Sequence, residues 1–276
     1  MTTIGSYDVH SAHRDPDAEI KRLAAQAHLG WEKEARTLSW FGLQDGMSLL
    51  ELGSGPGFIT KQLVNLLPNS PITCLEIDTS LIQQAEAYLR IDASNHVHLV
   101  EGSIMEMDFA EHSFDFAYAR LLFQHLPDPI NAARHVLRVL KPGGKLVIYD
   151  IDDDISDFYE PRVPAYDRIA KRMAQAQAAQ GGNRYIGRRL WRVLKTAGFK
   201  ALDMEVIATH SDAIGIEPFL PQIDPDRLLP LLDLCLISER ELEDVRQGRE
   251  SFLASPEPYL LNLSMMVSGQ KPVSLV

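Results

Sequence analysis

The 276-residue chain contains only two cysteines and has no excess of basic side chains. Two cysteines cannot form a disulfide framework or a cysteine-rich zinc site, and Cys74 and Cys235 both stand in apolar stretches that predict core positions. With 27 Lys and Arg against 38 Asp and Glu, the net charge of -11 disfavours nucleic acid as a partner, because phosphate binding requires a basic surface. The composition is otherwise that of a globular protein.

Long apolar runs are also missing. No apolar segment approaches the roughly 20 residues that a membrane-spanning helix needs. The polar, His-containing start, residues 1–17, does not have the pattern of a secretion signal. We therefore expect no membrane span and a cytoplasmic setting. The oligomeric state stays open, a homodimer included.

The most informative stretch is a glycine cluster that follows a short apolar strand. Gly53, Gly55 and Gly57 come after Glu51, and a helical pattern follows them. A strand that turns into a helix through glycines can form a cradle in which a ligand lies against bare backbone. A dinucleotide fingerprint requires its third glycine at position 58, where this chain has Phe58. The spacing therefore argues against dinucleotide binding, while an ordinary tight turn remains the alternative.

Strand and helix patterns alternate between residues 48 and 150. This alternation predicts βαβ units and a parallel, doubly wound α/β sheet. In such a sheet, ligands bind beyond the carboxyl ends of the strands, so the loops that follow the strands are the places to search. The expected strands are 48–52, 72–77, 97–101, 114–119 and 145–150, and the expected helices between them are 60–67, 80–90 and 129–140.

An acid stands at the end of the second expected strand. Glu76 follows the glycine loop by about twenty residues, where a carboxylate can accept hydrogen bonds from the hydroxyls of a nucleoside ribose. A solvated acid at a strand end is the alternative. Asp78, two residues later, is placed to cap the helix that is expected from Ser80.

In their order along the chain, these motifs resemble class I S-adenosylmethionine (SAM)-dependent methyltransferases, in the small-molecule branch of type 11/25. The resemblance rests on E-x-G-x-G-x-G from Glu51, on Glu76, and on the SFD, QHLPDP and VLKPGG phrases within residues 113–144. It covers residues 48–150. It implies a Rossmann-like seven-stranded sheet of six parallel strands and an antiparallel last strand, with SAM as methyl donor and S-adenosylhomocysteine as product.

The resemblance also implies which residues hold the cofactor. Ser103 stands where the family often has an Asp for the adenine amino group, so this departure makes the adenine contact less certain. Arg120 and Gln124 would lie near the methionine part of SAM, although Arg120 could equally pair with a structural acid. Tyr7 would close an aromatic ring over the sulfonium. The expected cofactor-binding residues are Tyr7, Glu51, Gly53, Ser54, Gly55, Gly57, Glu76, Ile77, Ser103, Ile104, Arg120 and Gln124.

The segments outside the core are expected to provide the acceptor pocket. An irregular stretch opens the segment after the fifth strand, and a long connection precedes the last strand; such connections in a compact domain are usually functional. Together with the N-terminal helices they would roof the pocket. The expected divisions are an N-terminal arm with cap helices (1–47), the SAM-binding core (48–150), a lid insertion (151–184), a core helix and strand (185–208), a second cap insertion (209–258) and the last strand and tail (259–276).

A few side chains are candidates for the chemistry. His125 follows the fourth strand, where a general base could reach an acceptor, with a hydrogen-bonded packing role as the alternative. Asp150 could bind an acceptor amine or hydroxyl and is the second catalytic candidate. The acid run 150–154 could suit Mg²⁺, but adjacent acids in a loop point in different directions, so we expect no metal. The expected acceptor pocket includes Trp31, which could instead pack its helix onto the sheet, and also Asp152 and Tyr159.

Methyl transfer from a sulfonium is an in-line displacement on an activated methyl group. Alignment of the reactants alone can supply on the order of 7 to 11 kcal/mol, so the lack of a nucleophilic triad is no objection. The prediction is a SAM-dependent methyltransferase (EC 2.1.1) that acts on a small molecule such as a natural product, a quinone-like compound or an amine metabolite. The alternative is a SAM-binding protein that transfers no methyl group, either a regulatory protein or a rearrangement enzyme. Protein or RNA methylation fits the acidic charge poorly.

Overall fold

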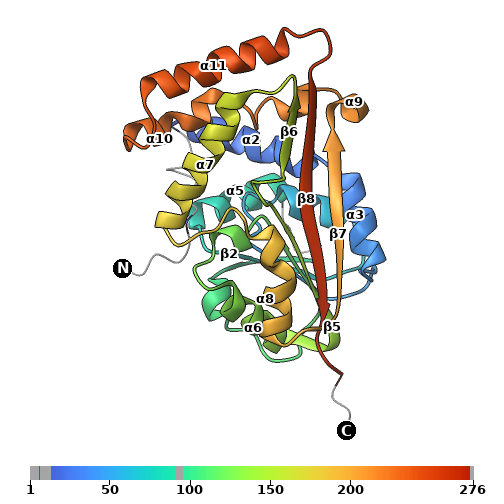
Figure 1. Ribbon diagram of the computed structural model, residues 1–276. Helices are drawn as coiled ribbons and strands as arrows, with labels where there is room; N and C mark the ends of the chain where they lie inside the picture. Colours follow the sequence, from blue (N-terminus) through green and yellow to red (C-terminus); the bar gives the residue numbers. More distant parts are fainter. Residues whose placement is uncertain (1–5, 7–13, 91–95, 274–276) are drawn as a thin grey trace.

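An open sheet with helices on both faces organises the chain (Figure 1). The computed structural model describes residues 6, 14–90 and 96–273. The strand order is β3-β2-β1-β4-β5-β8, with β7 at the edge beyond β8. β1 to β5 pair in parallel, and β8 runs antiparallel to both β5 and β7. This confirms the predicted doubly wound sheet with an antiparallel last strand. The strands are β1 (Leu49–Leu52), β2 (Ile72–Glu76), β3 (Val97–Glu101), β4 (Phe114–Arg120), β5 (Leu140–Asp150), β6 (Asp157–Glu160), β7 (Lys200–His210) and β8 (Tyr259–Gln270).

The short strand β6 lies in a stretch that the sequence indicated as irregular. It pairs with the first part of β8, where Tyr159 lies opposite Leu260. β8 pairs with β5 only from Met265 onward, so its first residues would leave backbone groups without partners on that side. A passing segment that supplies these hydrogen bonds becomes a strand because unpaired backbone groups are costly to bury.

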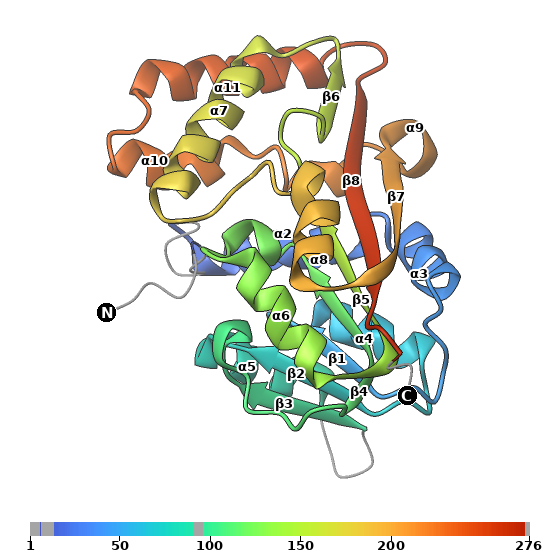
Figure 2. The same ribbon diagram turned by 60° about the horizontal axis from the view of Figure 1, so that its bottom comes forward.

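Helices cover both faces of the sheet. α6 and α8 lie together on one face (Figure 2), while α3, α4 and α5 pack on the other. Leu49, Leu50 and Leu52 of β1 are all fully buried, because a central parallel strand is covered on both faces. The α-helices are α2 (Pro16–His28), α3 (Trp31–Trp40), α4 (Phe58–Leu66), α5 (Thr79–Leu89), α6 (Pro129–Val139), α7 (Pro164–Ala179), α8 (Leu190–Ala197), α9 (Ser211–Ile214), α10 (Leu229–Asp233) and α11 (Glu239–Leu253).

Local signals in the sequence set the helix ends. The Asp78 side chain accepts hydrogen bonds from the N–H groups of Ser80 and Leu81, as expected of an N-cap. Gly198 ends α8 in the left-handed conformation that favours glycine, with a φ of 113°. Because these signals are local, the helix bounds lie close to those expected from the sequence.

The segments between β5 and α8 and between β7 and β8 build a cap with a core of its own. In Figure 1 the cap helices α7, α10 and α11 lie at one end of the sheet, beside the first part of β8. Phe219 and Phe252 are buried in the cap, with Leu260 of β8 in the same apolar cluster. None of the helices within the described ranges is long and apolar enough to cross a membrane.

The two cysteines differ in their surroundings. Cys74 of β2 is buried, as expected. Cys235 is exposed, so the expectation of a core position was wrong. The reason is local: α10 ends at Asp233, and Cys235 then takes a φ of 55°, which turns the chain out of the helix.

Candidate functional site

A cavity of about 610 Å³ lies beyond the carboxyl ends of β1, β2 and β4. Residues of the glycine loop and Glu76 line its core side. Residues of α2, α7, α10 and the 3₁₀ turn η5 (Pro225–Leu228) line its cap side. The cavity therefore joins the sheet edge that the topology favours for ligands to the segments that the sequence predicted as a roof.

The glycine loop leaves room for a ligand at one particular position. Gly53, Gly55 and Gly57 all have left-handed φ angles, of 69°, 55° and 82°. A Cβ on Gly55 would meet nothing within 4 Å, whereas a Cβ on Gly57 would lie 3.1 Å from Cβ of Ala85. Gly57 is thus required for the packing of α5, and Gly55 borders open space in the cavity.

The hydroxyl of Ser54 is a buried polar group on the cavity wall. It has no hydrogen-bond partner among the residues that the structure describes. A buried polar group without a partner costs free energy, so a ligand that supplies the partner is favoured there. The open space at Gly55 and the unpaired hydroxyl of Ser54 together fit a polar ligand laid against this loop.

Glu76 is fixed at the end of β2 by backbone donors. Its Oε2 accepts from the N–H of Gly55 at 2.8 Å. Its Oε1 accepts from the N–H groups of Ile77 and Asp78 at 2.8 and 3.0 Å. A carboxylate has lone pairs for further donors, so Glu76 can still accept from ligand hydroxyls.

Glu51 lies deeper than Glu76. The hydroxyl of Thr60 donates to its Oε2 at 2.7 Å, and the thiol of Cys74 lies 3.4 Å from the same oxygen. Burial raises the pKa of Glu51 to about 7, an effect that the bond from Thr60 partly offsets. These contacts join the end of β1 to the first turn of α4 and so fix the glycine loop between them.

Most of the predicted cofactor residues meet at this cavity. Gly57 packs behind the loop and does not line the cavity, and Tyr7 lies outside the described residues. Ser103 accepts from the N–H of Met105 at 3.1 Å, which leaves its hydroxyl proton for another partner. The predicted residues that line the cavity are Glu51, Gly53, Ser54, Gly55, Glu76, Ile77, Ser103, Ile104, Arg120 and Gln124.

Arg120 is held by an acid from another element. Its Nε donates to Oε2 of Glu34 at 3.0 Å, and its Nη2 donates to the carbonyl of Gln26 at 2.9 Å. The guanidinium also lies over the ring of Tyr149. The hydroxyl of Tyr118 donates to Glu34 at 2.5 Å. The structural pairing that the sequence left open is thus present, and the contact of Arg120 with a cofactor stays a prediction.

The two catalytic candidates lie in different surroundings. His125 lines the cavity, and its Nδ1 lies 2.9 Å from Oγ of Ser6. Burial, together with the positive charges of Arg184 and Arg22, lowers the pKa of His125 to about 3, so its ring is neutral near pH 7. A base with so low a pKa is inefficient near neutral pH.

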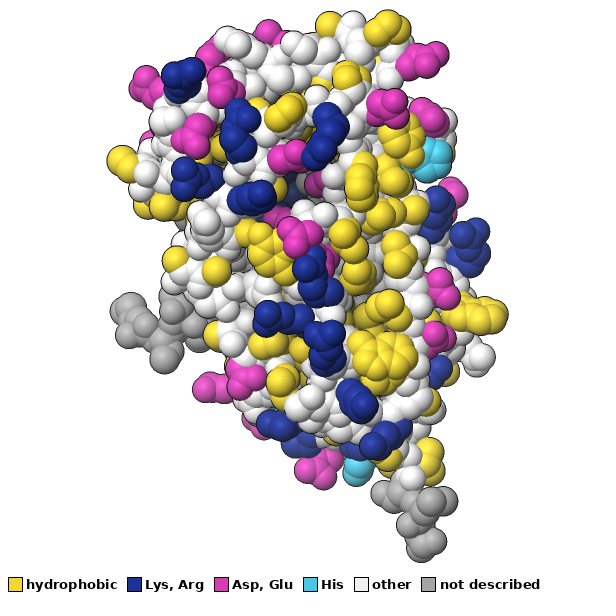
Figure 3. All heavy atoms as spheres, viewed as in Figure 1, with side chains coloured by type: hydrophobic (Ala, Val, Ile, Leu, Met, Phe, Trp, Pro, Cys, Tyr) yellow, Lys and Arg dark blue, Asp and Glu magenta, His cyan; other side chains and the backbone are white. Residues whose placement is uncertain are grey.

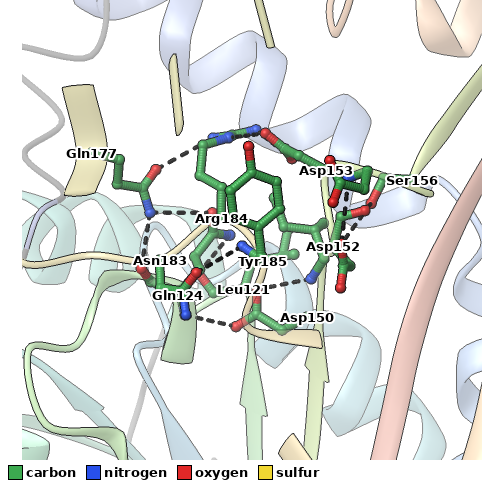
Figure 4. A network of polar contacts seen from close by, with 12 residues as sticks. Leu121, Gln124, Asp150, Asp152, Asp153, Ser156, Gln177, Asn183, Arg184 and Tyr185 are labelled. Atoms are coloured by element: carbon green, nitrogen blue, oxygen red, sulfur yellow. Dashed lines mark hydrogen bonds and ion pairs between the residues drawn. The ribbon is translucent and has the colours of Figure 1, made fainter. Parts of the chain in front are cut away.

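Asp150 is buried outside the cavity lining. It accepts hydrogen bonds from the N–H groups of Gln124 and Ile151, and burial raises its pKa to about 7. Figure 4 shows Asp150 beside Gln124. The structure therefore does not bring Asp150 and the ring of His125 together on one cavity wall, and the catalytic roles of both stay predictions.

The three residues expected in the acceptor pocket do not line this cavity. Trp31 packs against the apolar cluster under α3 and α4, which is the packing role that the sequence left open. Tyr159 stacks on Tyr166 within the cap, with ring centroids 4.9 Å apart. Asp152 is buried and paired with Arg188.

The acids of the 150–154 run have partners of their own. Asp152 and Asp154 pair with Arg188. Asp153 pairs with Arg184 (Figure 4). Within the described ranges, no group of three or more His, Cys, Asp or Glu side chains is arranged to hold a metal ion.

Sequence reasoning missed the polar residues on the cap side of the cavity. Gln177 of α7 donates to the carbonyl of Gln124 at 2.9 Å and lies 3.3 Å from Nδ1 of His125. Only the three-residue spacing of Glu19 and Arg22 on a helix was a local signal for an ion pair. The missed polar residues that line the cavity are Ser6, Glu19, Arg22, Gln26, Gln177, Gln180, Arg184 and Arg227.

Known proteins match the central part of the chain. Residues 50–148 match the methyltransferase domain family. Sterol 24-C-methyltransferase of Aspergillus fumigatus is 29% identical over 174 residues, which are 63% of this chain and 45% of that protein. Demethylmenaquinone methyltransferase of Listeria welshimeri is 24% identical over 148 residues, which are 53% of this chain and 59% of that protein. The chain thus spans about half the length of these curated relatives.

Solved structures share the fold over most of the chain. Phosphoethanolamine N-methyltransferase 2 of Haemonchus contortus, solved with phosphomonomethylethanolamine and S-adenosylhomocysteine, has a TM-score of 0.57 at 18% identity. The match covers 88% of this chain and 53% of that one. The cyclase SpnF has a TM-score of 0.54 at 20% identity, over 87% of this chain and 82% of the cyclase. At these identities the likeness is one of fold.

Proposed function

We propose that the chain, whose residues 50–148 match the methyltransferase domain family, is a class I SAM-dependent methyltransferase that transfers the methyl group of SAM to a small-molecule acceptor. The observation that carries this proposal is a continuous cavity that runs from the glycine loop to the cap. Its volume of about 610 Å³ lies within the range of small-molecule sites. The net charge of -11 supports an acceptor other than nucleic acid.

SAM supplies a methyl group that its sulfonium already activates. The residues on the core side hold the cofactor: Gly55 leaves space beside the backbone, Ser54 offers a hydroxyl, and Glu76 accepts hydrogen bonds from ribose hydroxyls. The cap lines the other side of the cavity and would keep water from the reacting groups once both ligands are bound. Positioning and water exclusion are the main contributions that a methyl transfer needs from the protein.

The acceptor loses one proton during methyl transfer, and the protein does not have to supply a strong base to remove it. His125 is neutral, and its ring lies next to Ser6 and Gln177 on the cavity wall. It can orient an acceptor through a hydrogen bond, whereas its low pKa makes it a weak base. An acceptor that carries an acidic hydroxyl, or an amine in its neutral form, requires no strong base from the protein.

Within the small-molecule class, the acceptor we propose is a natural product, a quinone-like compound or an amine metabolite. The curated relatives support this range, since their names give a sterol and demethylmenaquinone as acceptors. A second function, SAM binding without methyl transfer, is favoured by one observation. The fold is shared with a cyclase as well as with methyltransferases.

Incubation with methyl-labelled SAM tests the proposal. The purified chain is added to a cell extract separated into small-molecule, protein and RNA fractions, with Glu76→Ala as the inactive control. Label in the small-molecule fraction that depends on the unmodified chain is expected. Label in the protein or RNA fraction alone would contradict the proposal. SAM binding with no label in any fraction would favour the function without transfer.

A further inference from the structure

Three guanidinium groups from separate parts of the chain line the cap side of the cavity. Arg22 belongs to α2, Arg184 follows α7, and Arg227 belongs to η5. α2, η5 and the segment after α7 thus bring positive charge to the lining of the cavity.

Two of these arginines have carboxylate partners. Arg22 pairs with Glu19 at 2.6 Å, and both side chains are almost fully buried. Arg184 pairs with Asp153, and its Nη1 also lies 3.3 Å from Oε1 of Gln177 (Figure 4). The charges of these two arginines are therefore balanced by their partners.

Arg227 has a backbone partner in place of a carboxylate. Its Nη1 donates to the carbonyl of Gln222, and it forms no ion pair with any residue in the described part of the chain. The side chain of Gln222 accepts from Arg22 at 2.9 Å, so the same residue holds both arginines. Arg227 is thus a fixed cation on the cavity wall with guanidinium N–H groups left for a ligand.

The surroundings of Arg227 disfavour its charge. Burial is the main cause, and with the nearby charges of Arg22 and Arg184 it lowers the pKa of Arg227 to about 9, although Glu19 and Asp157 act in the opposite direction. The group still carries its charge near pH 7. An anion that enters the cavity would remove this penalty, because a buried charge is stabilised by a partner.

The surface of the same cap shows a different arrangement. On the face that Figure 3 shows, basic and acidic side chains lie next to each other over the cap. Two ion pairs between exposed cap residues are Arg246–Asp226 and Arg168–Asp244. Arg227, by contrast, lines the cavity and has no carboxylate partner among the described residues.

Apolar side chains lie beside the arginines on the cap side of the cavity. They come from α2, α7, α10 and the residue that follows α10, and would contact a hydrocarbon or aromatic body. These apolar residues are Leu23, Met173, Pro230, Leu231 and Leu234.

We propose that Arg227 binds an anionic group, a carboxylate or a phosphate monoester, on an acceptor that has an apolar body. The anionic group lies at η5, the apolar body contacts α7 and α10, and the methylated atom faces the glycine loop. This inference rests on the proposed function, since it concerns the acceptor end of the same cavity. Charge-assisted hydrogen bonds from arginine to oxyanions are strong and directional, so this residue would select the acceptor.

Binding of matched probes to the full chain saturated with S-adenosylhomocysteine tests the inference. The probes are phenylacetate, benzyl phosphate and the uncharged benzyl alcohol, followed by saturation-transfer NMR. At least one anion is expected to bind more tightly than benzyl alcohol, on the order of ten-fold. The two anions distinguish a carboxylate site from a phosphate site.

Arg227→Met and the matched control Arg246→Met locate the anion site. Arg227→Met should weaken binding of the preferred anion on the order of ten- to a hundred-fold, with benzyl alcohol unchanged. It should not lower the melting temperature, since it removes a buried cation without a carboxylate. Arg246→Met removes only an exposed pair with Asp226 and should bind all probes as the unmodified chain does.

Three results would overturn the inference. Equal affinity for the anions and for benzyl alcohol would show that the cavity has no anion site. Unchanged anion affinity in Arg227→Met would show that the anion site lies at another residue. A loss of S-adenosylhomocysteine affinity in Arg227→Met would assign the arginine to the carboxylate of the cofactor. By contrast, failure of the unmodified chain to bind S-adenosylhomocysteine would overturn the proposed function itself, so the two failures are distinguishable.

Discussion

The carboxylate of Glu76 accepts a hydrogen bond from the backbone N–H of Gly55 at 2.8 Å, across 21 positions of the sequence. This contact ties the end of β2 to the turn that follows β1. The acid and the glycine loop are therefore positioned together before any ligand enters. A cradle arranged in advance binds more tightly because less ordering remains to be done on binding.

Gly55→Ala is expected to weaken binding of S-adenosylhomocysteine by on the order of ten-fold or more. The added methyl group meets no protein atom within 4 Å and would stand in the space of the ligand. The left-handed φ of 55° adds a cost to folding of about 1 to 2 kcal/mol. Isothermal titration calorimetry measures the affinity, and thermal unfolding measures the stability.

Gly46→Ala is the matched control. Gly46 also has a left-handed φ, of 90°, and a Cβ there would again meet nothing within 4 Å, but it does not line the cavity. Gly46→Ala should lose about as much stability as Gly55→Ala and keep the affinity of the unmodified chain for S-adenosylhomocysteine. Equal loss of affinity in both variants would mean that backbone strain, and not the ligand space at Gly55, is the cause.

Breaking the pair of Arg120 and Glu34 should destabilise the fold. Arg120→Met or Glu34→Gln alone leaves one partner buried without its counterpart, which typically costs about 3 to 5 kcal/mol. The double variant should recover part of this loss. Urea unfolding of the four proteins gives the coupling, and single losses below about 1 kcal/mol would contradict a structural pair.

The same double variant tests the predicted cofactor contact of Arg120. If the guanidinium serves only Glu34 and the carbonyl of Gln26, the affinity for S-adenosylhomocysteine should match that of the unmodified chain. A weaker affinity in a folded double variant would show that Arg120 also contacts the cofactor.

Glu51 should make stability fall as pH rises. Its pKa is about 7 in the folded chain against an ordinary 4.5, so between these values the folded state binds more protons than the unfolded state. Glu51→Gln removes this titration while keeping an oxygen for Thr60. The free energy of unfolding of Glu51→Gln minus that of the unmodified chain should therefore increase by on the order of 3 kcal/mol between about pH 5 and about pH 8.

Comparison with the unmodified chain isolates Glu51 in this experiment. The raised pKa of Asp150 also makes stability fall as pH rises, whereas the lowered pKa of His125 makes stability rise. Because both groups are present in the variant and in the unmodified chain, their effects cancel in the difference between the two proteins. Glu101→Gln, at the exposed end of β3, provides a second control. A difference in melting temperature that stays constant with pH would contradict the buried position of the Glu51 carboxyl.

The sequence predicted the core better than the cap because core signals are local. The apolar run at β1, the cap at Asp78 and the glycine at 198 each act within a few residues, and most elements of the core lie close to the expected bounds. β5 differs, because it begins at Leu140 and not at the expected residue 145. β6 forms because the first residues of β8 have no partner on the β5 side, and these residues lie about a hundred positions later in the chain. A long-range partner of this kind leaves no local pattern.

The residues of the candidate site also fall into two groups, those that the sequence predicted and those that depend on tertiary packing. Glu76 and the glycine loop were predicted from spacing, since strand ends in a parallel sheet meet at one edge. Arg184 and Arg227 reach the cavity only through the packing of the cap, which no periodicity encodes. Asp152 looked available in the sequence, yet Arg188 holds it away from the cavity. Side-chain pairing in loops depends on tertiary contacts and cannot be predicted from composition.

The affinity for S-adenosylhomocysteine, measured by calorimetry on the unmodified chain, Glu76→Ala and Glu101→Ala, tests the central claim most directly. The unmodified chain and Glu101→Ala should bind in the micromolar range. Glu76→Ala should bind on the order of a hundred-fold more weakly, because it lacks the charged acceptor at the cavity wall. No binding by the unmodified chain, or equal binding by Glu76→Ala, would contradict the assignment of this cavity to SAM.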